Sequence, residues 1–188
     1  MASHPKDLMT PEEYLTIERR SEFKSEYFAG ETFAMAGGSK RHNLLAGNIN
    51  RIIGTQLLER DCNVYNSDMR VKIGSVGKYT YPDASVACAE EQFEDEDEDT
   101  LLNPVLIIEV LSKSTEAYDR GKKWEHYQRL DSLRDYLLIS QTPYRVEQFT
   151  RQQGGSWSYI EYVGESDVID IKSIGCSLLL RDIYAKLR

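Results

Sequence analysis

An apolar run interrupted by one glutamate constrains this chain more than any other feature. Residues 104–111 read Pro-Val-Leu-Ile-Ile-Glu-Val-Leu, so the run has almost no polar alternation. Such a run is typical of a strand that is buried on both faces. Covering both faces requires further elements on each side of the sheet. We therefore expect an α/β fold in which a mixed central β-sheet is flanked by helices, with residues 105–111 as a central strand.

Glu109, inside this run, has no simple structural explanation, because a buried carboxylate is costly without a partner. A second acid, Asp83, follows Tyr81 and Pro82 and precedes another apolar segment. If the two strands are neighbours, the carboxylates repel each other unless a divalent cation lies between them. The alternatives are a turn role for Asp83 after proline and a structural pair with an arginine for Glu109.

The pair of acids suggests a metal site suited to phosphodiester hydrolysis. Mg²⁺ prefers oxygen ligands and keeps several waters, so two carboxylates and one backbone carbonyl form a minimal site. We expect Asp83 and Glu109 to be catalytic and to bind Mg²⁺ or Mn²⁺, and Val110 to supply the carbonyl. The bound ion would activate water and stabilise charge on the phosphate.

A lysine could assist the attacking water and offset negative charge in the transition state. Lys123 is the best candidate, and helical spacing places Asp119 and Tyr127 on the same face. Lys122 points about 100° away and is expected in solvent. The alternative is that Lys123 is an ordinary surface lysine paired with Asp119.

Other polar residues are candidates for supporting roles. Residues that could surround the metal site are His42, Glu31, Glu26, Tyr127 and Asp119. For His42 the alternative is packing against the apolar face of its own helix. Arg70 and Lys72 alternate along a strand and could contact phosphates, unless they only form a solvated face.

Composition limits the class of protein. The 188 residues carry a net charge of −8, which argues against a protein that coats nucleic acid non-specifically. Eight acids fall within residues 90–99, so the rest of the chain is close to neutral, and we expect a mobile, solvated acidic loop there. The three cysteines are far apart and form no CxxC pair, so neither a disulfide framework nor a zinc site is expected.

Local patterns predict the order of elements. A capping box beginning at Thr10 predicts an N-terminal helix over residues 8–20, and Ser39 can cap a second helix. Strands are expected at 24–36 as a hairpin, at 63–67, 69–73, 81–87, 134–140, 144–150, 156–163 and near 168. Helices are expected at about 115–130 and 178–187. We expect one domain spanning residues 1–188.

Several motifs together resemble a known family. They are Tyr81-Pro82-Asp83, Ile108-Glu109-Val110-Leu111-Ser112, Tyr118-Asp119-Arg120-Gly121-Lys122-Lys123 and Glu125-His126-Tyr127, with further matches at 27–31, 37–43 and 67–71. This set is similar to the Uma-type restriction endonucleases, a bacterial family long catalogued as a domain of unknown function. That family belongs to the PD-(D/E)xK nuclease superfamily. The resemblance runs from about residue 10 to 185.

The resemblance implies a restriction-endonuclease-like fold with Asp83 and Glu109 as the metal carboxylates. It also shows one departure, because the superfamily pattern has lysine two residues after the second acid, where this chain has Leu111. A migrated lysine, Lys123, would then reach the site from the following helix.

Three functions remain open from the sequence. The first is a Mg²⁺-dependent endonuclease that acts on DNA as a homodimer, so that both strands are cut. The second is a catalytically inactive module that keeps the nuclease fold and binds nucleic acid or protein, and the third is a structural oligomer. No apolar run approaches the length of a membrane span, and residues 1–7 lack the apolar stretch of a secretory leader, so we expect a cytoplasmic protein without a membrane partner.

Overall fold

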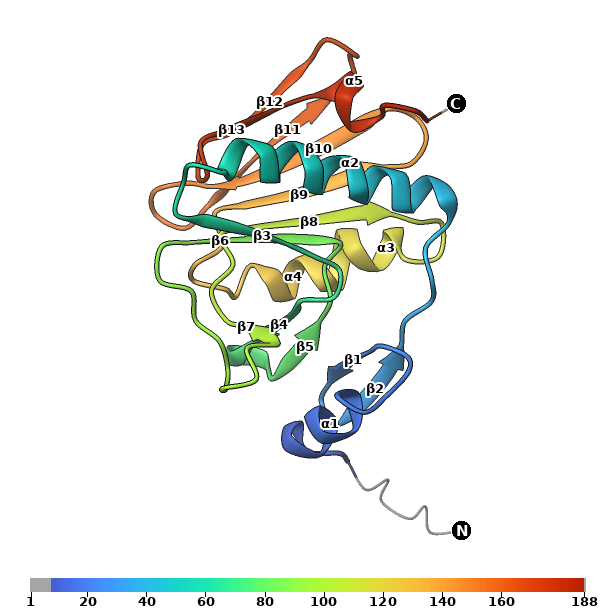
Figure 1. Cartoon of the computed structure of the whole chain (residues 1–188), viewed down its shortest axis with the longest axis vertical. Coiled ribbons are helices and arrows are strands. Elements are labelled where there is room, and N and C mark those ends of the chain that lie inside the picture. The colour runs from blue at the N-terminus through green and yellow to red at the C-terminus, as the bar shows by residue number, and fades with distance from the viewer. Residues whose placement is uncertain (1–7, 188) are drawn as a thin grey trace.

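Two β-sheets meet near the middle of the molecule (Figure 1), and the computed structural model describes residues 8–187. The larger sheet has six strands in the order β11-β10-β9-β8-β6-β3, of which β8 and β9 run parallel and the other pairs antiparallel. Its strands are β3 (Cys62–Asn66), β6 (Ala84–Cys88), β8 (Leu106–Leu111), β9 (Asp135–Ser140), β10 (Arg145–Arg151) and β11 (Trp157–Tyr162). The predicted mixed sheet is confirmed. The expectation for residues 1–7 lies outside the described part.

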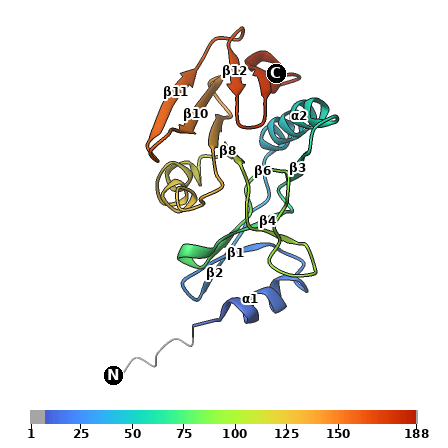
Figure 2. The same cartoon turned by 90° about the vertical axis from the view of Figure 1, so that its left-hand side faces the viewer.

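Strand β8 is an interior strand of this sheet, and all six of its residues are buried. On one face Leu106, Ile108 and Val110 pack with helix α2 (Lys40–Leu57). On the other face Ile107 and Leu111 pack with the helical segment that follows β8. Figure 2 shows these two helical layers on opposite sides of the sheet. The prediction of a central strand buried on both faces is confirmed.

The segment after β8 is helical but irregular. It contains α3 (Glu116–Tyr118), a π-helical turn at Asp119–Lys123 and α4 (Trp124–Tyr127). The predicted helix at about 115–130 is therefore present but ends earlier and widens in the middle. Gly121, a poor helix former, lies within the widened turn.

A second, five-stranded sheet in the order β2-β1-β5-β4-β7 was not anticipated from the sequence. Its elements are β1 (Ser25–Phe28), β2 (Glu31–Ala34), β4 (Arg70–Ile73), the 3-10 turn Gly74–Val76, β5 (Lys78–Thr80) and β7 (Thr100–Leu101). Helix α1 (Pro11–Glu18) packs on it through Tyr14, which stacks on Tyr27 and contacts Tyr79. The predicted hairpin at 24–36 is confirmed as β1 and β2, and the predicted strand at 69–73 as β4. Strands β5 and β7, of three and two residues, are too short to show a clear alternation.

The predicted helix starts are confirmed in detail. Thr10 and Glu13 form a complete capping box, although α1 is shorter than the predicted 8–20. The Ser39 side chain accepts a hydrogen bond from the backbone N–H of His42 at the start of α2. These caps satisfy amide groups that have no partner inside the helix.

The predicted C-terminal helix at 178–187 is wrong at both ends. Residues 176–179 form strand β13 (Cys176–Leu179), which pairs with β12 (Val168–Ile171) in a separate two-stranded sheet, and only α5 (Leu180–Ile183) is helical. In β13 the buried residues Cys176 and Leu178 alternate with exposed Ser177. This period of two is typical of a strand, but it runs directly into α5, so the apolar residues of both elements together resemble one helix.

The expectation about the cysteines is also corrected. Cys62 and Cys88 face each other across β3 and β6 and form a disulfide, with their Cα atoms 3.9 Å apart. Cys176 is free and buried. Sequence spacing could not show this pairing, because it depends on the register of two antiparallel strands.

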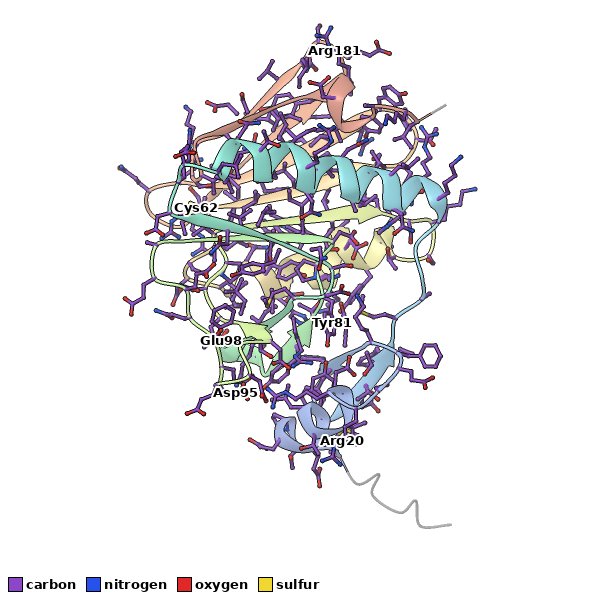
Figure 3. The ribbon with its side chains drawn as sticks, in the orientation of Figure 1. Arg20, Cys62, Tyr81, Asp95, Glu98 and Arg181 are labelled. Atoms are coloured by element: carbon purple, nitrogen blue, oxygen red, sulfur yellow. A yellow bond between two sulfur atoms is a disulfide. The ribbon has the colours of Figure 1, made fainter. Side chains whose placement is uncertain are left out.

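The acidic segment 90–99 is paired rather than simply solvated. Asp95, Asp97 and Asp99 all bind the guanidinium of Arg19 at the end of α1. In Figure 3, Asp95 and Glu98 lie on a loop in the lower part of the molecule, the part that also contains Arg20. No helix within residues 8–187 is long and apolar enough to cross a membrane.

Candidate functional site

A cleft of about 860 Å³ lies between the ends of the two sheets. Its lining includes Glu26 from the smaller sheet and Glu109 and Val110 from the larger one. Asp83 reaches it from the link Tyr81–Asp83, which joins β5 of the smaller sheet to β6 of the larger one. In Figure 3, Tyr81 is labelled between the larger sheet above it and the smaller sheet below it. The site therefore exists only because the chain crosses from one sheet to the other at this point.

Asp83 is fixed against β8. Its Oδ2 atom accepts a 2.7 Å hydrogen bond from the backbone N–H of Val110, which adjoins Glu109. The same oxygen lies 3.2 Å from Nε2 of His42, in the first turn of α2. This bond with Asp83 raises the pKa of His42, with burial opposing it. The antiparallel pairing of β6 with β8 brings Asp83 beside Glu109, as predicted for neighbouring strands.

Glu109 is 4% exposed and lies on the face of β8 that meets the helical segment. Its Oε1 atom accepts a 2.8 Å hydrogen bond from the Tyr127 hydroxyl and lies 2.8 Å from Nζ of Lys123. Burial raises the pKa of Glu109 to about 8, with Asp119 and Asp83 adding to the shift and Lys123 opposing it. A carboxyl group with such a pKa exchanges its proton near neutral pH.

Lys123 is 5% exposed and reaches the acids from the π-helical turn. Its Nζ atom lies 2.8 Å from Glu109, 3.3 Å from Glu26 and 3.7 Å from Asp119. Burial disfavours its charge, but these three carboxyl groups outweigh burial and raise its pKa well above the ordinary value. Glu109 and Lys123 share one proton equilibrium, and we take Lys123 as the charged partner because three acids surround it.

The structure also shows why lysine does not stand two residues after Glu109. That position is Leu111, which is 3% exposed and packs in the core formed with Tyr127 and Leu130. Lys122 is 72% exposed, as predicted, and it pairs with Glu125. Lys123 is therefore not the surface lysine of the alternative interpretation.

Glu26 connects the site to a group that sequence reasoning missed. Its Oε2 atom lies 3.0 Å from Nζ of the buried Lys78 and accepts a 3.1 Å hydrogen bond from the Tyr118 hydroxyl, while its Oε1 atom accepts one from Thr80. Burial opposes ionisation of Glu26, but Lys123 and Lys78 overcome it and lower its pKa to about 2. Lys78 gave no signal in the sequence because β5 is only three residues long.

Three predicted residues lie elsewhere. Glu31 is on β2 opposite Phe28 and does not line the cleft. Arg70 is 3% exposed and binds Asp99, Thr100 and Tyr81 within the smaller sheet, whereas Lys72 pairs with Glu94. The structure thus gives Arg70 and Lys72 carboxylate partners within the molecule and places neither in the lining of the cleft, and their contact with phosphates stays a prediction. The remaining candidates, His42, Glu26, Tyr127 and Asp119, contact the predicted catalytic residues.

The donor set fits a hard divalent cation, though without a dense cluster of ligands. Within residues 8–187 no three His, Cys, Asp or Glu side chains are grouped to hold a metal ion. The contacts described above engage Oδ2 of Asp83 and Oε1 of Glu109, which leaves the second oxygen of each for another ligand. With the Val110 carbonyl these oxygens match the preference of Mg²⁺ for few protein ligands and several waters.

Comparisons with known proteins identify the family and the fold. The model of the Uma2 family, described as "Putative restriction endonuclease", matches residues 11–180. Two uncharacterized proteins of Synechocystis sp. are 38% and 36% identical to this chain, covering 98% and 87% of it and 96% and 92% of their own lengths.

A crystal structure from Anabaena variabilis, described as a "putative nuclease belonging to DUF820", superposes with a TM-score of 0.77. It covers 94% of this chain and 98% of its own, at 19% identity, which shows a shared fold. The family match extends over nearly the whole described chain, including both acids and Lys123. The chain therefore belongs to the Uma2 family of restriction-endonuclease-like proteins, and this membership points to a nuclease.

Proposed function

We propose that this protein is a Mg²⁺-dependent endonuclease that hydrolyses phosphodiester bonds of DNA. The observation that carries the proposal is the convergence of Asp83, Glu109 and Lys123 in one cleft, from a link, a strand and a helical turn far apart in sequence. Buried ionisable groups in a cleft, with pKa values displaced by burial and specific partners, are typical of catalytic sites.

Each residue has a role that its contacts support. Asp83, held by the Val110 amide, and Glu109, held by the Tyr127 hydroxyl, would bind the metal. The metal, when bound, would activate water and stabilise charge on the scissile phosphate. Lys123 would orient the attacking water and offset the developing negative charge, since its ammonium group is kept charged by the surrounding acids.

Glu26 and His42 would position these groups rather than act on the substrate. Glu26 binds Lys123 from the smaller sheet, and His42 binds Asp83 at the oxygen that also accepts the Val110 amide bond. A homodimer would supply two such sites, one for each strand of a duplex.

A plasmid-nicking assay with Mg²⁺ or Mn²⁺ tests the proposal. Asp83→Asn keeps the size of the side chain but removes its charge, so we expect cleavage to fall at least about a hundredfold, a typical effect of losing charge stabilisation at a reacting centre. Cleavage by the variant at the wild-type rate would contradict the assignment, because the activity would then come from a contaminant.

One observation favours a second function, a nuclease-fold module that binds without cutting. The lysine of the superfamily pattern is replaced by Leu111, and no three-ligand cluster is present among residues 8–187. Absence of cleavage with every divalent metal, together with retained DNA binding, would support this module over the nuclease.

A further inference from the structure

The cleft contains positive groups that the catalytic residues do not use. Five of its lining side chains can carry positive charge: Arg41, His42, Lys113, Lys123 and Arg145. Three of these are engaged by carboxylates, since His42 binds Asp83, Lys123 binds Glu109 and Arg145 binds Glu147 and Glu161. Arg41 and Lys113 remain.

Neither Arg41 nor Lys113 has a carboxylate partner within residues 8–187. Arg41 uses only its Nε atom, which donates a 2.6 Å hydrogen bond to the Gln141 carbonyl. Lys113 is exposed and follows the end of β8 by two residues. In a chain of net charge −8, cations without carboxylate partners inside a cleft are a distinctive feature.

Gln141 joins Arg41 to the end of the strand that leads to Lys113. Gln141 accepts the bond from Arg41, donates a 2.9 Å bond from Nε2 to the Leu111 carbonyl and accepts a 3.0 Å bond from the Ser39 hydroxyl. This residue therefore ties the start of α2 to the ends of β8 and β9. Lys113 leaves the strand immediately beyond the tied carbonyl, so both cations lie at the same end of the cleft.

Their position beside the acids suits a phosphate next to the scissile one. Lys113 lies two residues beyond the end of β8, which carries Glu109, and Arg41 adjoins His42, which binds Asp83. Hydroxyl groups of Ser112, Ser114 and Thr115 line the cleft in the same stretch and can donate to phosphate oxygens.

We propose that Arg41 and Lys113 form a phosphate-binding rim that holds the nucleic acid strand beside the scissile phosphate. The proposal rests on the proposed nuclease function for its ligand. In this proposal Arg41 and Lys113, rather than Arg70 and Lys72, contact the phosphates. They bind the nucleic acid backbone and do not distinguish between bases.

The test measures binding without cleavage. A labelled DNA duplex is titrated with protein in metal-free buffer at several salt concentrations, and fluorescence anisotropy gives the affinity. Lys113→Ala is compared with wild type and with Lys122→Ala, whose lysine is exposed, pairs with Glu125 and does not line the cleft. The slope of log affinity against log salt becomes shallower by about 0.9 for each phosphate that the protein no longer neutralises.

We expect the slope to become shallower by about 0.9 for Lys113→Ala and again for Lys113→Ala with Arg41→Gln, and to stay unchanged for Lys122→Ala. An unchanged slope for Lys113→Ala, an equal change in Lys122→Ala, or no DNA binding by wild type would overturn the proposal. If the slopes change as expected but no metal supports cleavage, the rim stands and the nuclease proposal fails. If wild type cleaves plasmid but the slopes do not change, the nuclease proposal stands and the phosphate-binding rim is excluded.

Discussion

Two acidic regions of this molecule differ in every respect except the sign of their charge. The segment 90–99 has eight acids in ten residues, most of them exposed or partly exposed, and three of its aspartates bind one arginine, Arg19. Four carboxyl groups of the cleft come from four separate segments, and three of them, Glu26, Glu109 and Asp119, surround Lys123, whereas Asp83 binds His42.

The difference shows that charge density along a chain is a poor guide to chemistry. In the acidic segment, the Arg19 guanidinium lowers the pKa of Asp99 well below its ordinary value. In the cleft, burial removes the water, and each pKa is then set by the few groups nearby. Glu109 is raised to about 8 and Glu26 is lowered to about 2 within one cluster, because Glu26 contacts two lysines and Glu109 contacts one.

The largest expected effect follows from removing the cation at the centre of the cleft. Lys123→Met leaves the acids without their shared partner and the attacking water without its positioning group. We expect the cleavage rate to fall about a thousandfold in the plasmid assay. Lys122→Met, a change one residue away at an exposed lysine, serves as the control. Equal rates for the two variants would remove Lys123 from the mechanism.

The next effect concerns the buried end of the acidic segment. Arg70 is 3% exposed and binds Asp99 at 2.8 Å, Thr100 and Tyr81. Arg70→Met should lower the free energy of unfolding by about 3 kcal/mol, because Asp99 and the hydroxyl groups lose a buried partner. Urea unfolding measures this, with the exposed Arg20→Met as a control. If DNA affinity rather than stability changed, our placement of Arg70 outside the binding surface would be wrong.

The smallest effect tests the proton on Glu109. Its pKa is raised from 4.5 to about 8, so the folded, metal-free protein keeps a proton that the unfolded chain loses between these values. This contribution to stability is present at low pH and is lost as pH rises to about 8. Because metal binding needs the carboxylate, Mg²⁺ affinity should rise by up to about tenfold per pH unit until about pH 8.

Calorimetric titration of Mg²⁺ in two buffers of different ionisation enthalpy counts the protons released on binding. The count should be close to one well below pH 8 and should vanish above it. A count of zero throughout would mean that Glu109 is already a carboxylate in the metal-free cleft, with Lys123 outweighing its burial.

The central strand and the helix starts were predictable because their signals are local in the sequence. The apolar run at 105–111 predicted an interior strand, and the caps at Thr10 and Ser39 predicted helix starts. In the smaller sheet the hairpin of β1 and β2 and strand β4 were predicted, but β5 and β7, of three and two residues, are too short to show a pattern, and the assembly of these strands into one sheet depends on tertiary contacts. The disulfide was missed for a related reason, since the pairing of Cys62 with Cys88 depends on strand register rather than on spacing.

The candidate site divides in the same way. The identities of Asp83, Glu109 and Lys123 could be proposed from residue chemistry and from the family resemblance. The partners of Arg70 and Lys72, Asp99 and Glu94, could not be predicted, because the sequence does not show which carboxylate a cation contacts. Lys78, Arg41 and Lys113 were not singled out, because their place in the cleft or beside it depends on how the two sheets meet, although Arg41 lies within the matching segment 37–43.

The sequence by itself determined which residues can carry charge and which strand must be buried. Only the tertiary structure decided which charged groups are exposed to water and which pair with another charged group. The reason is physical, because burial and the distance to a partner set the energy of an ionised group, and both arise from contacts between segments far apart in the chain. Glu109 and Lys123, 2.8 Å apart across a strand and a helical turn, show this most clearly.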